Sequence, residues 1–253
     1  MARYAELRNK GLGTPIARDA ANKEQVKKIF DKVRADGRSA LLGCEAAQVV
    51  AAYGIDAAPG RLVNSVDEAV AAAEELGFPI ALKIASPDIL HKSDVGGVKL
   101  GLKSTDEVAK EFTEMMARCS AVEGARILGV EVQRMMPAGR EVIIGMARDA
   151  SFGPMVMFGM GGIYVNLLQD VSFRLAHNLT EEDVAEMVRE TKAYTLLKGY
   201  RGEAPADIAA VEAAIAKVAA LVSDFPEIDE FDINPVFVYE KGLSAVDVKI
   251  TLA

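Results

Sequence analysis

The segment ALKIASPDILHKSDVGGVKLGL, residues 81–102, decides the fold class of this chain. Its ends, IALKI (80–84) and VKLGL (98–102), are short apolar runs that are typical of β-strands. The 13 residues between them, ASPDILHKSDVGG, have no apolar period and contain Pro, Ser, Asp and Gly, which predicts a loop. Because a loop this long between paired strands of a compact domain is usually functional, residues 85–97 are the first candidate for a site.

Helical patterns flank this segment. Apolar residues recur at helical spacing over residues 22–35, and CEAAQVVAAYG (44–54) predicts a second short helix. Two Ser-x-x-Glu capping boxes, which begin at Ser65 and Ser104, predict further helices that start at these serines.

Helices and strands alternate along the rest of the chain, as in α/β proteins. Runs of apolar residues predict strands at 127–134, 140–148, 154–159, 229–239 and 243–250. Two amphipathic stretches predict helices at 180–194 and 205–225. Because no low-complexity linker separates the halves, we expect two α/β lobes that pack against each other, with a ligand in the cleft between them.

The composition limits the classes of function. A net charge of −8 over 253 residues excludes a nucleic-acid binder that works by phosphate neutralisation, so a small-molecule partner is expected. Cys44 and Cys119 lack CxxC spacing, and with only two histidines, His91 and His177, no zinc framework can be assembled. No apolar run of 18 residues and no secretory pattern occurs, which predicts a soluble, cytoplasmic protein without a membrane partner.

Lys83 is the first candidate for a chemical role. It lies in an otherwise apolar strand, where an unpaired ammonium is costly. The sequence leaves two possibilities open: an anionic group meets Lys83, or its side chain points outward from a half-exposed strand.

The loop sequence HKSDVGG combines His91, Lys92 and Asp94 with the paired glycines Gly96 and Gly97. Paired glycines allow backbone N–H groups to approach a phosphate, and a histidine can accept a phosphoryl group or act as acid and base. A loop histidine is more often simply solvated, so the residues alone leave this alternative open.

Oxygen ligands gather near the end of the sequence, at Asp232, Asn234 and Asp247. If the last two predicted strands form a hairpin, Asn234 and Asp247 lie side by side and suit Mg²⁺ that keeps waters and binds nucleotide phosphates. The alternative is a pair of solvated polar residues near a turn, but Asp247 stands between two valines of the predicted strand. A glycine cluster, FGMGGIYVN (158–166), predicts a tight backbone turn near a ligand.

An ordered series of segments carries a family resemblance from residue 41 to residue 252. The segments are YGIDAAPGRLV (53–63), the run 81–102, VQRMMPAGREVIIGMARDASFGPMVMFGMGGIYV (132–165), DVSFRLA (170–176), LLKGYRG (196–202) and FDINPVFV (231–238). Together they resemble the ATP-grasp β subunits, or β-like domains, of ADP-forming acyl-CoA synthetases, such as ADP-forming acetyl-CoA synthetase. Succinyl-CoA synthetase β subunits look related through the GGVK and INP elements but lack the HKSD form of the loop.

The resemblance implies an ATP-grasp fold with the nucleotide in the cleft between two α/β lobes. It assigns residues 1–40 to an N-terminal arm and helix, residues 41–130 to a first lobe that carries a phosphohistidine loop at 85–97, and residues 131–253 to a second lobe with the Mg²⁺ site.

The resemblance also implies roles for individual residues. Contacts with ATP or ADP fall to Lys83, Gly96, Gly97, the hinge residues Val132, Gln133, Arg134 and Met135, then Glu141 and Arg174. The Mg²⁺ ligands are Asn234 and Asp247. His91 is similar to the second phosphohistidine of the family, with Lys92 and Asp94 beside it as catalytic residues. Asn166 departs from the pattern, since relatives often have an acidic residue there.

The activity that the resemblance implies is reversible: acyl-CoA, ADP and phosphate give a carboxylic acid, CoA and ATP through a phosphohistidine. Because the chain has no Gly-rich Rossmann fingerprint for CoA, a CoA-binding α subunit is expected as partner, in an α2β2 heterotetramer. The alternatives are a non-catalytic nucleotide-sensing module and a carboxylate–amine ligase. His91 together with Lys83 and Asp247 favours the acyl-CoA synthetase.

Overall fold

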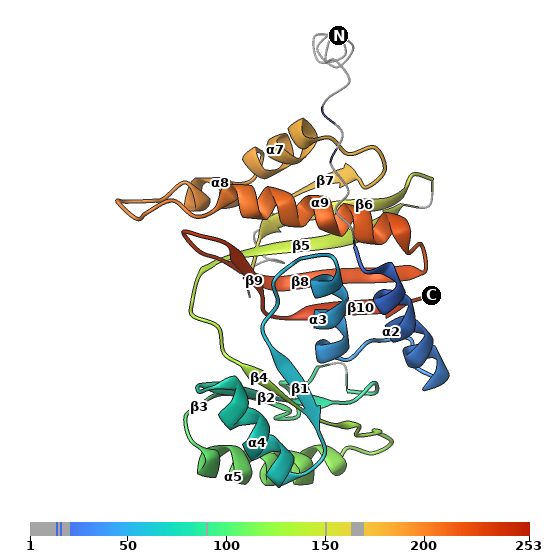
Figure 1. Cartoon of the computed structure of the whole chain (residues 1–253), viewed down its shortest axis with the longest axis vertical. Helices are drawn as coiled ribbons and strands as arrows, with labels where there is room; N and C mark the ends of the chain where they lie inside the picture. The colour runs from blue at the N-terminus through green and yellow to red at the C-terminus, as the bar shows by residue number, and fades with distance from the viewer. Residues whose placement is uncertain (1–13, 15, 17–20, 90, 150, 163–169) are drawn as a thin grey trace. The chain divides into compact units, whose positions relative to one another are not determined.

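The structure, a computed structural model, describes residues 14, 16, 21–89, 91–149, 151–162 and 170–253 (Figure 1). The chain forms two compact units, and one of them is discontinuous in sequence. Unit 1 contains Met1–Ala21 and Gly139–Leu243, and unit 2 contains Asn22–Ala138 and Ser244–Ala253.

Unit 2 contains an antiparallel sheet in the order β1 (Gly60–Val63), β4 (Gly129–Arg134), β2 (Ile80–Ala85), β3 (Val98–Leu102). The two strands predicted around the long loop are therefore direct neighbours. In this register Lys83 of β2 lies opposite Glu131 of β4 and Val98 of β3. The antiparallel pairing therefore places both ends of the loop at the same end of the β2–β3 pair.

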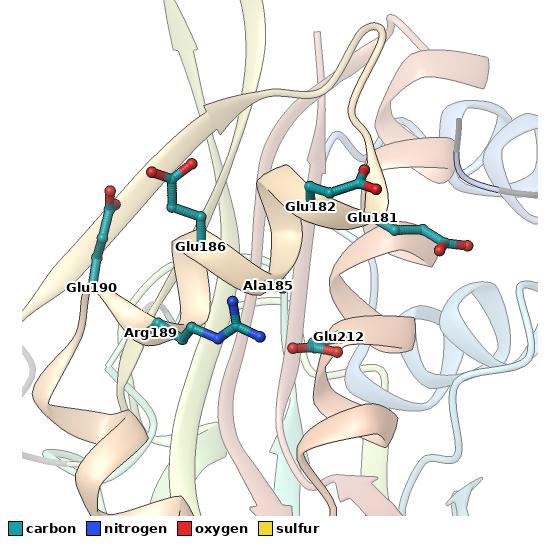
Figure 2. Close-up of a pocket in the computed structure, with 7 residues that line it drawn as sticks. All are labelled: Glu181, Glu182, Ala185, Glu186, Arg189, Glu190 and Glu212. Carbon is teal, nitrogen blue, oxygen red and sulfur yellow. The ribbon is translucent and has the colours of Figure 1, made fainter. Parts of the chain in front are cut away.

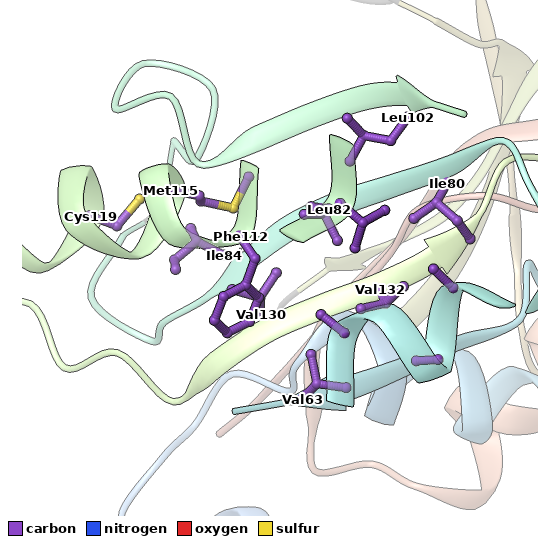
Figure 3. Close-up of a cluster of buried hydrophobic side chains, with 14 of the residues drawn as sticks. Val63, Ile80, Leu82, Ile84, Leu102, Phe112, Met115, Cys119, Val130 and Val132 are labelled. Carbon is purple, nitrogen blue, oxygen red and sulfur yellow. The ribbon is translucent and has the colours of Figure 1, made fainter. Parts of the chain in front are cut away.

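Two helices, α4 (Val66–Leu76) and α5 (Thr105–Ser120), cover one face of this sheet and form the core in Figure 3. Alternate residues of β2, namely Ile80, Leu82 and Ile84, are fully buried in that core. Because side chains of a strand alternate between faces, Lys83 points to the opposite face, away from the helices.

Both serine caps are confirmed. The Ser65 and Ser104 hydroxyls accept hydrogen bonds from the amides of Glu68 and Glu107, each at 3.2 Å. The glutamate carboxylates do not bond to the cap residues themselves, as a capping box requires, but to the amide one position earlier. The helices begin at the predicted places with this small difference.

The remaining part of unit 2 consists of α2 (Lys23–Ala35), α3 (Gly43–Ala52) and β10 (Val248–Leu252). A buried ion pair lies at the start of α3, where Arg38 donates to both carboxylate oxygens of Glu45 at 2.8 and 3.0 Å. Burial favours the neutral acid, but the bonds from Arg38 and from the Leu42 amide outweigh it and lower the pKa of Glu45.

Unit 1 contains a sheet in which β8 (Ile228–Val238), β5 (Arg140–Asp149), β6 (Gly153–Met160) and β7 (Val171–Leu175) lie in that order, with antiparallel pairing. Three helices pack on its strands: α7 (Glu181–Arg189), α8 (Lys192–Leu197) and α9 (Ile208–Asp224) (Figure 1). Asp207 caps α9 by accepting a hydrogen bond from the Ala210 amide at 2.9 Å.

Two predicted elements are wrong because each is interrupted. The helix expected at 180–194 is split into α7 and α8, since the Asp170 carboxylate accepts from the amides of Lys192 and Ala193 and starts a new helix there. The strand expected at 243–250 is split into β9 (Leu243–Ala245) and β10, with Val246 and Asp247 between them. Strands β1 and β7 have no counterpart among the predicted elements.

The compact units do not coincide with the predicted domain limits. A boundary after residue 130 would cut β4, whose residues pair with β1 and β2 on both sides. The structural limits fall instead at 138/139 and 243/244. Most of the predicted N-terminal arm, and Asn166, lie outside the described residues.

Candidate nucleotide and phosphoryl-transfer site

Lys83 and Asp247 form an ion pair in unit 2. Lys83 Nζ lies 2.9 Å from Asp247 Oδ1. The Lys83 side chain is only 13% exposed, whereas that of Asp247 is 61% exposed. Of the two possibilities left open for Lys83, the first holds, because its side chain meets an anionic group; β2 is a buried strand, not a half-exposed one. The pair gives each charge a partner at a site that solvent reaches from the Asp247 side.

The interruption between β9 and β10 is held in place by backbone and side-chain bonds. Gln133 Nε2 donates to the Val246 carbonyl at 3.0 Å. On the preceding residue, the Ala245 carbonyl accepts from the Ala58 amide at 2.8 Å. These bonds place the Asp247 carboxylate opposite Lys83. Gln133 was predicted for its backbone in a hinge, and its side chain provides this contact.

Glu131 is a buried carboxylate that the sequence analysis did not single out. It lies opposite Lys83 in the β2–β4 register and is 4% exposed. Its Oε1 accepts from the Cys44 amide at 3.2 Å, in the first turn of α3, where the helix dipole favours a negative charge. A Cβ on Gly43 would stand 2.6 Å from Glu131 Oε2, so this close approach requires glycine.

Cys44 is a protonated thiol rather than a nucleophile. Burial, and then the nearby carboxylates of Glu131 and Glu45, raise the pKa of Cys44 to about 12.

The segment from His91 to Gly97 is a compact turn, named here the histidine turn. The amides of Asp94, Gly96 and Gly97 donate to the carbonyls of His91, Ser93 and Lys92, at 3.1, 3.1 and 2.7 Å. The side chains of His91 and Asp94 are exposed, and Lys92 is half-buried. In this conformation the two glycine amides are used inside the turn. Their contact with a phosphate therefore stays a prediction, and it would require these bonds to open.

Gly97 and Gly96 have different structural reasons to be glycine. A Cβ on Gly97 would stand 2.5 Å from Ile84 Cγ2, because the Gly97 carbonyl accepts from the Ile84 amide at 2.7 Å and draws the backbone against β2. Gly96 has a φ of +66°, which favours glycine. Both glycines therefore shape the turn and its attachment to the sheet.

The hinge residues Val132 to Met135 lie at the end of the central strand β4. Val132 is buried in the core, and the amides of Arg134 and Met135 donate to the carbonyls of Pro59 and Pro79, each at 3.0 Å. These two N–H groups are thus engaged within unit 2. An adenine base bound at this hinge would therefore have to form its hydrogen bonds with other backbone groups.

A second group of predicted residues meets in unit 1. The Gly162 amide donates to Asn234 Oδ1 at 2.9 Å, and the Gly161 amide donates to the Glu141 carbonyl at 3.1 Å. A Cβ on Gly162 would clash with the Glu141 carboxylate. Gly161 and Gly162 therefore link Glu141 to Asn234, and the tight turn near a ligand expected for this cluster stays a prediction. Residues 163–166 of that cluster lie outside the described residues.

Arg174 is not part of this group. It lies on β7, three strands from β8 in the sheet order, and its guanidinium is 2.9 Å from the Glu190 carboxylate. Within unit 1 the structure brings Glu141 and Asn234 together and leaves Arg174 apart from them.

A cavity of about 650 Å³ on unit 1 has the wrong charge for a nucleotide. Figure 2 shows its lining, which consists of Ala185, Arg189 and the carboxylates of Glu181, Glu182, Glu186, Glu190 and Glu212. Burial raises the pKa of Glu212, although Arg189 opposes the shift. Five glutamates around one arginine repel a polyphosphate, so cavity size does not locate the nucleotide site.

Two negative observations hold for the part of the chain that the structure describes. It contains no cluster of three or more His, Cys, Asp or Glu side chains that could hold a metal ion. None of its helices has the length and apolar character needed to cross a membrane. A Mg²⁺ ion needs no such cluster, since it binds through one or two protein oxygens together with waters and phosphates.

Comparisons with known proteins identify the family of this chain. The ATP-grasp domain family matches residues 32–252. The β subunit of ADP-forming acetate–CoA ligase I from Pyrococcus furiosus is 45% identical over 229 residues, which cover 90% of this chain and 98% of that subunit. ADP-forming acetate–CoA ligase I from Archaeoglobus fulgidus is also 45% identical, over 100% of this chain but only 36% of the longer relative.

A solved structure gives the same result. Acetyl-coenzyme A synthetase 1 from Ca. Korarchaeum cryptofilum, in complex with coenzyme A and Mg-AMPPCP, is described with a phosphohistidine segment pointing towards the nucleotide binding site. It matches with a TM-score of 0.80 and 43% identity over 90% of this chain and 100% of that one. The chain therefore belongs to the ATP-grasp family, among the β subunits of ADP-forming acetate–CoA ligases.

Proposed function

We propose that this chain is the nucleotide-binding β subunit of an ADP-forming acyl-CoA synthetase, with acetyl-CoA as the expected substrate. The reaction converts acyl-CoA, ADP and phosphate into a carboxylic acid, CoA and ATP. One observation carries the proposal: Lys83, which is paired with Asp247, lies on the strand that leads directly into the loop with His91. The full-length likeness to named β subunits supports it.

The proposed chemistry proceeds in three steps. Phosphate attacks the thioester carbonyl, CoA leaves as the thiol, and an acyl phosphate forms on the partner subunit. An imidazole nitrogen of His91 then takes the phosphoryl group and releases the carboxylate. A terminal oxygen of ADP finally takes the phosphoryl group from His91, so that ATP forms and the imidazole is restored.

Lys83 and Asp247 suit the transfer of the phosphoryl group to ADP, because each can exchange its present ion-pair partner for a group of the bound nucleotide complex. In the free chain each neutralises the other at 2.9 Å. When a nucleotide binds, the ammonium can turn to its phosphates and the carboxylate can turn to a metal ion. Neither charge is then left without a partner in a part-buried setting, which would be costly.

The donor atoms suit Mg²⁺. Asp247 offers a carboxylate and Asn234 an amide oxygen, and hard oxygen ligands of this kind are those that Mg²⁺ prefers. We propose these two residues as its protein ligands, as the family resemblance implies. When bound, the ion would neutralise charge on the phosphates during transfer. The role of this chain's residues is to hold the phosphates with Lys83 and to present the His91 imidazole.

His91 distinguishes this function from the rivals. A nucleotide-sensing module and a carboxylate–amine ligase have no use for an exposed imidazole on a shaped turn. The roles of Lys92, Asp94, Glu141, Arg174 and the hinge residues remain proposals that rest on the family resemblance. For Arg174 the ion pair with Glu190 would first have to open.

Reconstitution tests the function. The purified chain is assayed for ATP formation from acetyl-CoA, ADP and phosphate, alone and with the CoA-binding subunit encoded in the same genome. We expect ATP only from the mixture, and ADP binding with Mg²⁺ by the chain alone. ATP formation by the chain alone would refute the split enzyme. Nucleotide binding without ATP formation by the mixture would favour the sensing module.

The partner follows from the same argument. Acyl-CoA cleavage needs a pocket of its own, so we propose assembly with a CoA-binding α subunit, as an α2β2 heterotetramer in the cytoplasm. Light scattering of the reconstituted complex gives its mass and checks this stoichiometry.

A further inference from the structure

We propose that Arg118, held by Glu111, is a positioning residue that fastens the histidine turn to α5. This inference rests on the proposed function, because it concerns the turn that carries His91. It assigns to α5 a part in the phosphoryl relay as the anchor that controls how often the turn leaves its described position.

The contact is direct. Arg118 Nη2 donates to the Gly96 carbonyl at 3.0 Å and lies 2.5 Å from Glu111 Oε1. The side chain of Glu111 is 10% exposed, whereas that of Arg118 is 41% exposed. The buried carboxylate of Glu111, two turns back on the same helix, thus fixes the direction of the guanidinium, and the same Arg118 nitrogen donates to both Glu111 and the Gly96 carbonyl.

The backbone of Gly96 is shaped for this contact. Its φ of +66° lies in the left-handed region, and a Cβ at this position would stand 3.0 Å from Arg118 Nε. A side chain there would both strain the backbone and press on the guanidinium. The contact with Arg118 therefore depends on a glycine at position 96.

The turn is held by its own backbone and from two neighbouring elements. Three backbone hydrogen bonds close it between His91 and Gly97, and the Gly97 carbonyl also accepts from the Ile84 amide of β2 at 2.7 Å. Among the described residues, Arg118 provides the side-chain bond from α5 to this turn. On the other side of the loop, the Asp88 carboxylate accepts from the Arg126 amide at 2.8 Å. Releasing the Arg118 contact removes the link to α5, so that the three bonds of the turn open more often while the Ile84 amide still holds Gly97 to β2.

Hydrogen exchange of the full chain tests the anchor. In Arg118→Met, exchange at the amides of Asp94, Gly96 and Gly97 should rise by about tenfold, the effect of losing one charge-assisted hydrogen bond. Arg118→Lys keeps the charge and should restore part of the protection. Glu114→Gln is the matched control, because Glu114 is the exposed neighbour of Arg118 at 3.9 Å and has no contact with the turn.

A purely structural role for Arg118 predicts a different pattern. In that case exchange would rise along α5, at Met115 and Cys119, and the turn would follow only in proportion. Exchange confined to the turn supports the anchor. Unchanged exchange at Gly96 and Gly97 in Arg118→Met overturns it, as does a rise spread over α5.

Turnover separates this inference from the proposed function. With the CoA-binding subunit, Arg118→Met should change kcat several-fold and leave the affinity for ADP, measured by calorimetry on the chain alone, unchanged. If the wild-type mixture makes no ATP while the exchange pattern is as expected, the function is wrong and the anchor stands. If the wild type is active and Arg118→Met has wild-type kcat, the anchor has no part in the relay.

Discussion

Lys83 Nζ lies 2.9 Å from Asp247 Oδ1, although 164 positions separate the two residues in the sequence. The contact depends on the interruption between β9 and β10, which leaves Asp247 outside the regular strand and places its carboxylate at Lys83. Under the proposed roles of the two residues, a nucleotide and a metal ion would have to break this ion pair in order to bind.

Lys83→Ala should weaken ADP binding in the presence of Mg²⁺ by about 1.5 to 3 kcal/mol, because a charge-assisted contact with phosphate is lost. Calorimetry on the chain alone measures the affinity. Lys103→Ala, which removes an exposed ammonium from the same unit, is the control and should bind as the wild type does. Equal affinities for Lys83→Ala and the wild type would remove Lys83 from the site.

Asp247→Asn should change the affinity for ADP in opposite directions with and without Mg²⁺. With Mg²⁺ the affinity should fall and the Mg²⁺ concentration needed for turnover should rise, because a metal ligand is lost. With a chelator the affinity should rise, because Lys83 no longer has to leave a carboxylate. Glu123→Gln, at an exposed position, should show neither effect. An unaltered Mg²⁺ dependence in Asp247→Asn would refute its role as a ligand.

His91→Asn should abolish phosphorylation of the chain and leave nucleotide affinity unchanged. With labelled ATP, the other substrates of the reverse reaction and the complete complex, the wild type should carry an acid-labile, base-stable label. His177→Asn removes the second histidine, which is also exposed, and should keep the label. Full acyl-CoA-dependent ATP synthesis by His91→Asn would show that no phosphohistidine forms at this position.

Arg38→Ala should lower the free energy of unfolding by about 3 to 5 kcal/mol, because it leaves the buried carboxylate of Glu45 without its partner. Arg61→Ala breaks an exposed ion pair with Glu75 and should cost less than about 1 kcal/mol. Urea titration followed by circular dichroism compares them, since the chain has no Trp. Similar losses for both variants would show that the Arg38 pair does not stabilise unit 2.

Asp207→Ala should destabilise unit 1 by about 1 kcal/mol at neutral pH, through loss of the cap of α9. Hydrogen bonds from the amides of Gly242 and Ala210 lower the pKa of Asp207. A lowered pKa gives stability above the ordinary value near 4 that is lost as the pH falls through the folded value. The difference between variant and wild type should therefore shrink below about pH 4. Asp229→Ala, at an exposed carboxylate, should show no such change.

Local patterns were sufficient to predict most elements. Strands β2 and β3 begin and end where the apolar runs do, because alternate residues of β2 are buried in the core. The caps at Ser65 and Ser104 could be predicted because they involve neighbouring residues. The breaks at Thr191 and at Asp247 could not be predicted, because a distant Asp170 and a distant Gln133 hold them.

The charged residues of the candidate site could be predicted from the sequence. The side chains that contact and position them could not. Lys83 and Asp247 stand out because a charge interrupts apolar sequence. The Gln133 side chain contacts a carbonyl 113 positions away, and Arg118 contacts one 22 positions away, so neither has a local signal. Glu131 looks like any strand glutamate until the register brings the start of α3 to it.

The discontinuity of unit 2 sets an order of events during synthesis. Residues 22–138 leave the ribosome first, but residues 244–253, which include Asp247 and β10, follow only after the whole of 139–243. Because domains tend to fold as they emerge, unit 1 can fold while unit 2 still lacks a strand. A nascent chain that has reached residue 243 therefore holds Lys83 without its carboxylate. The proposed nucleotide site becomes complete only when translation passes Asp247.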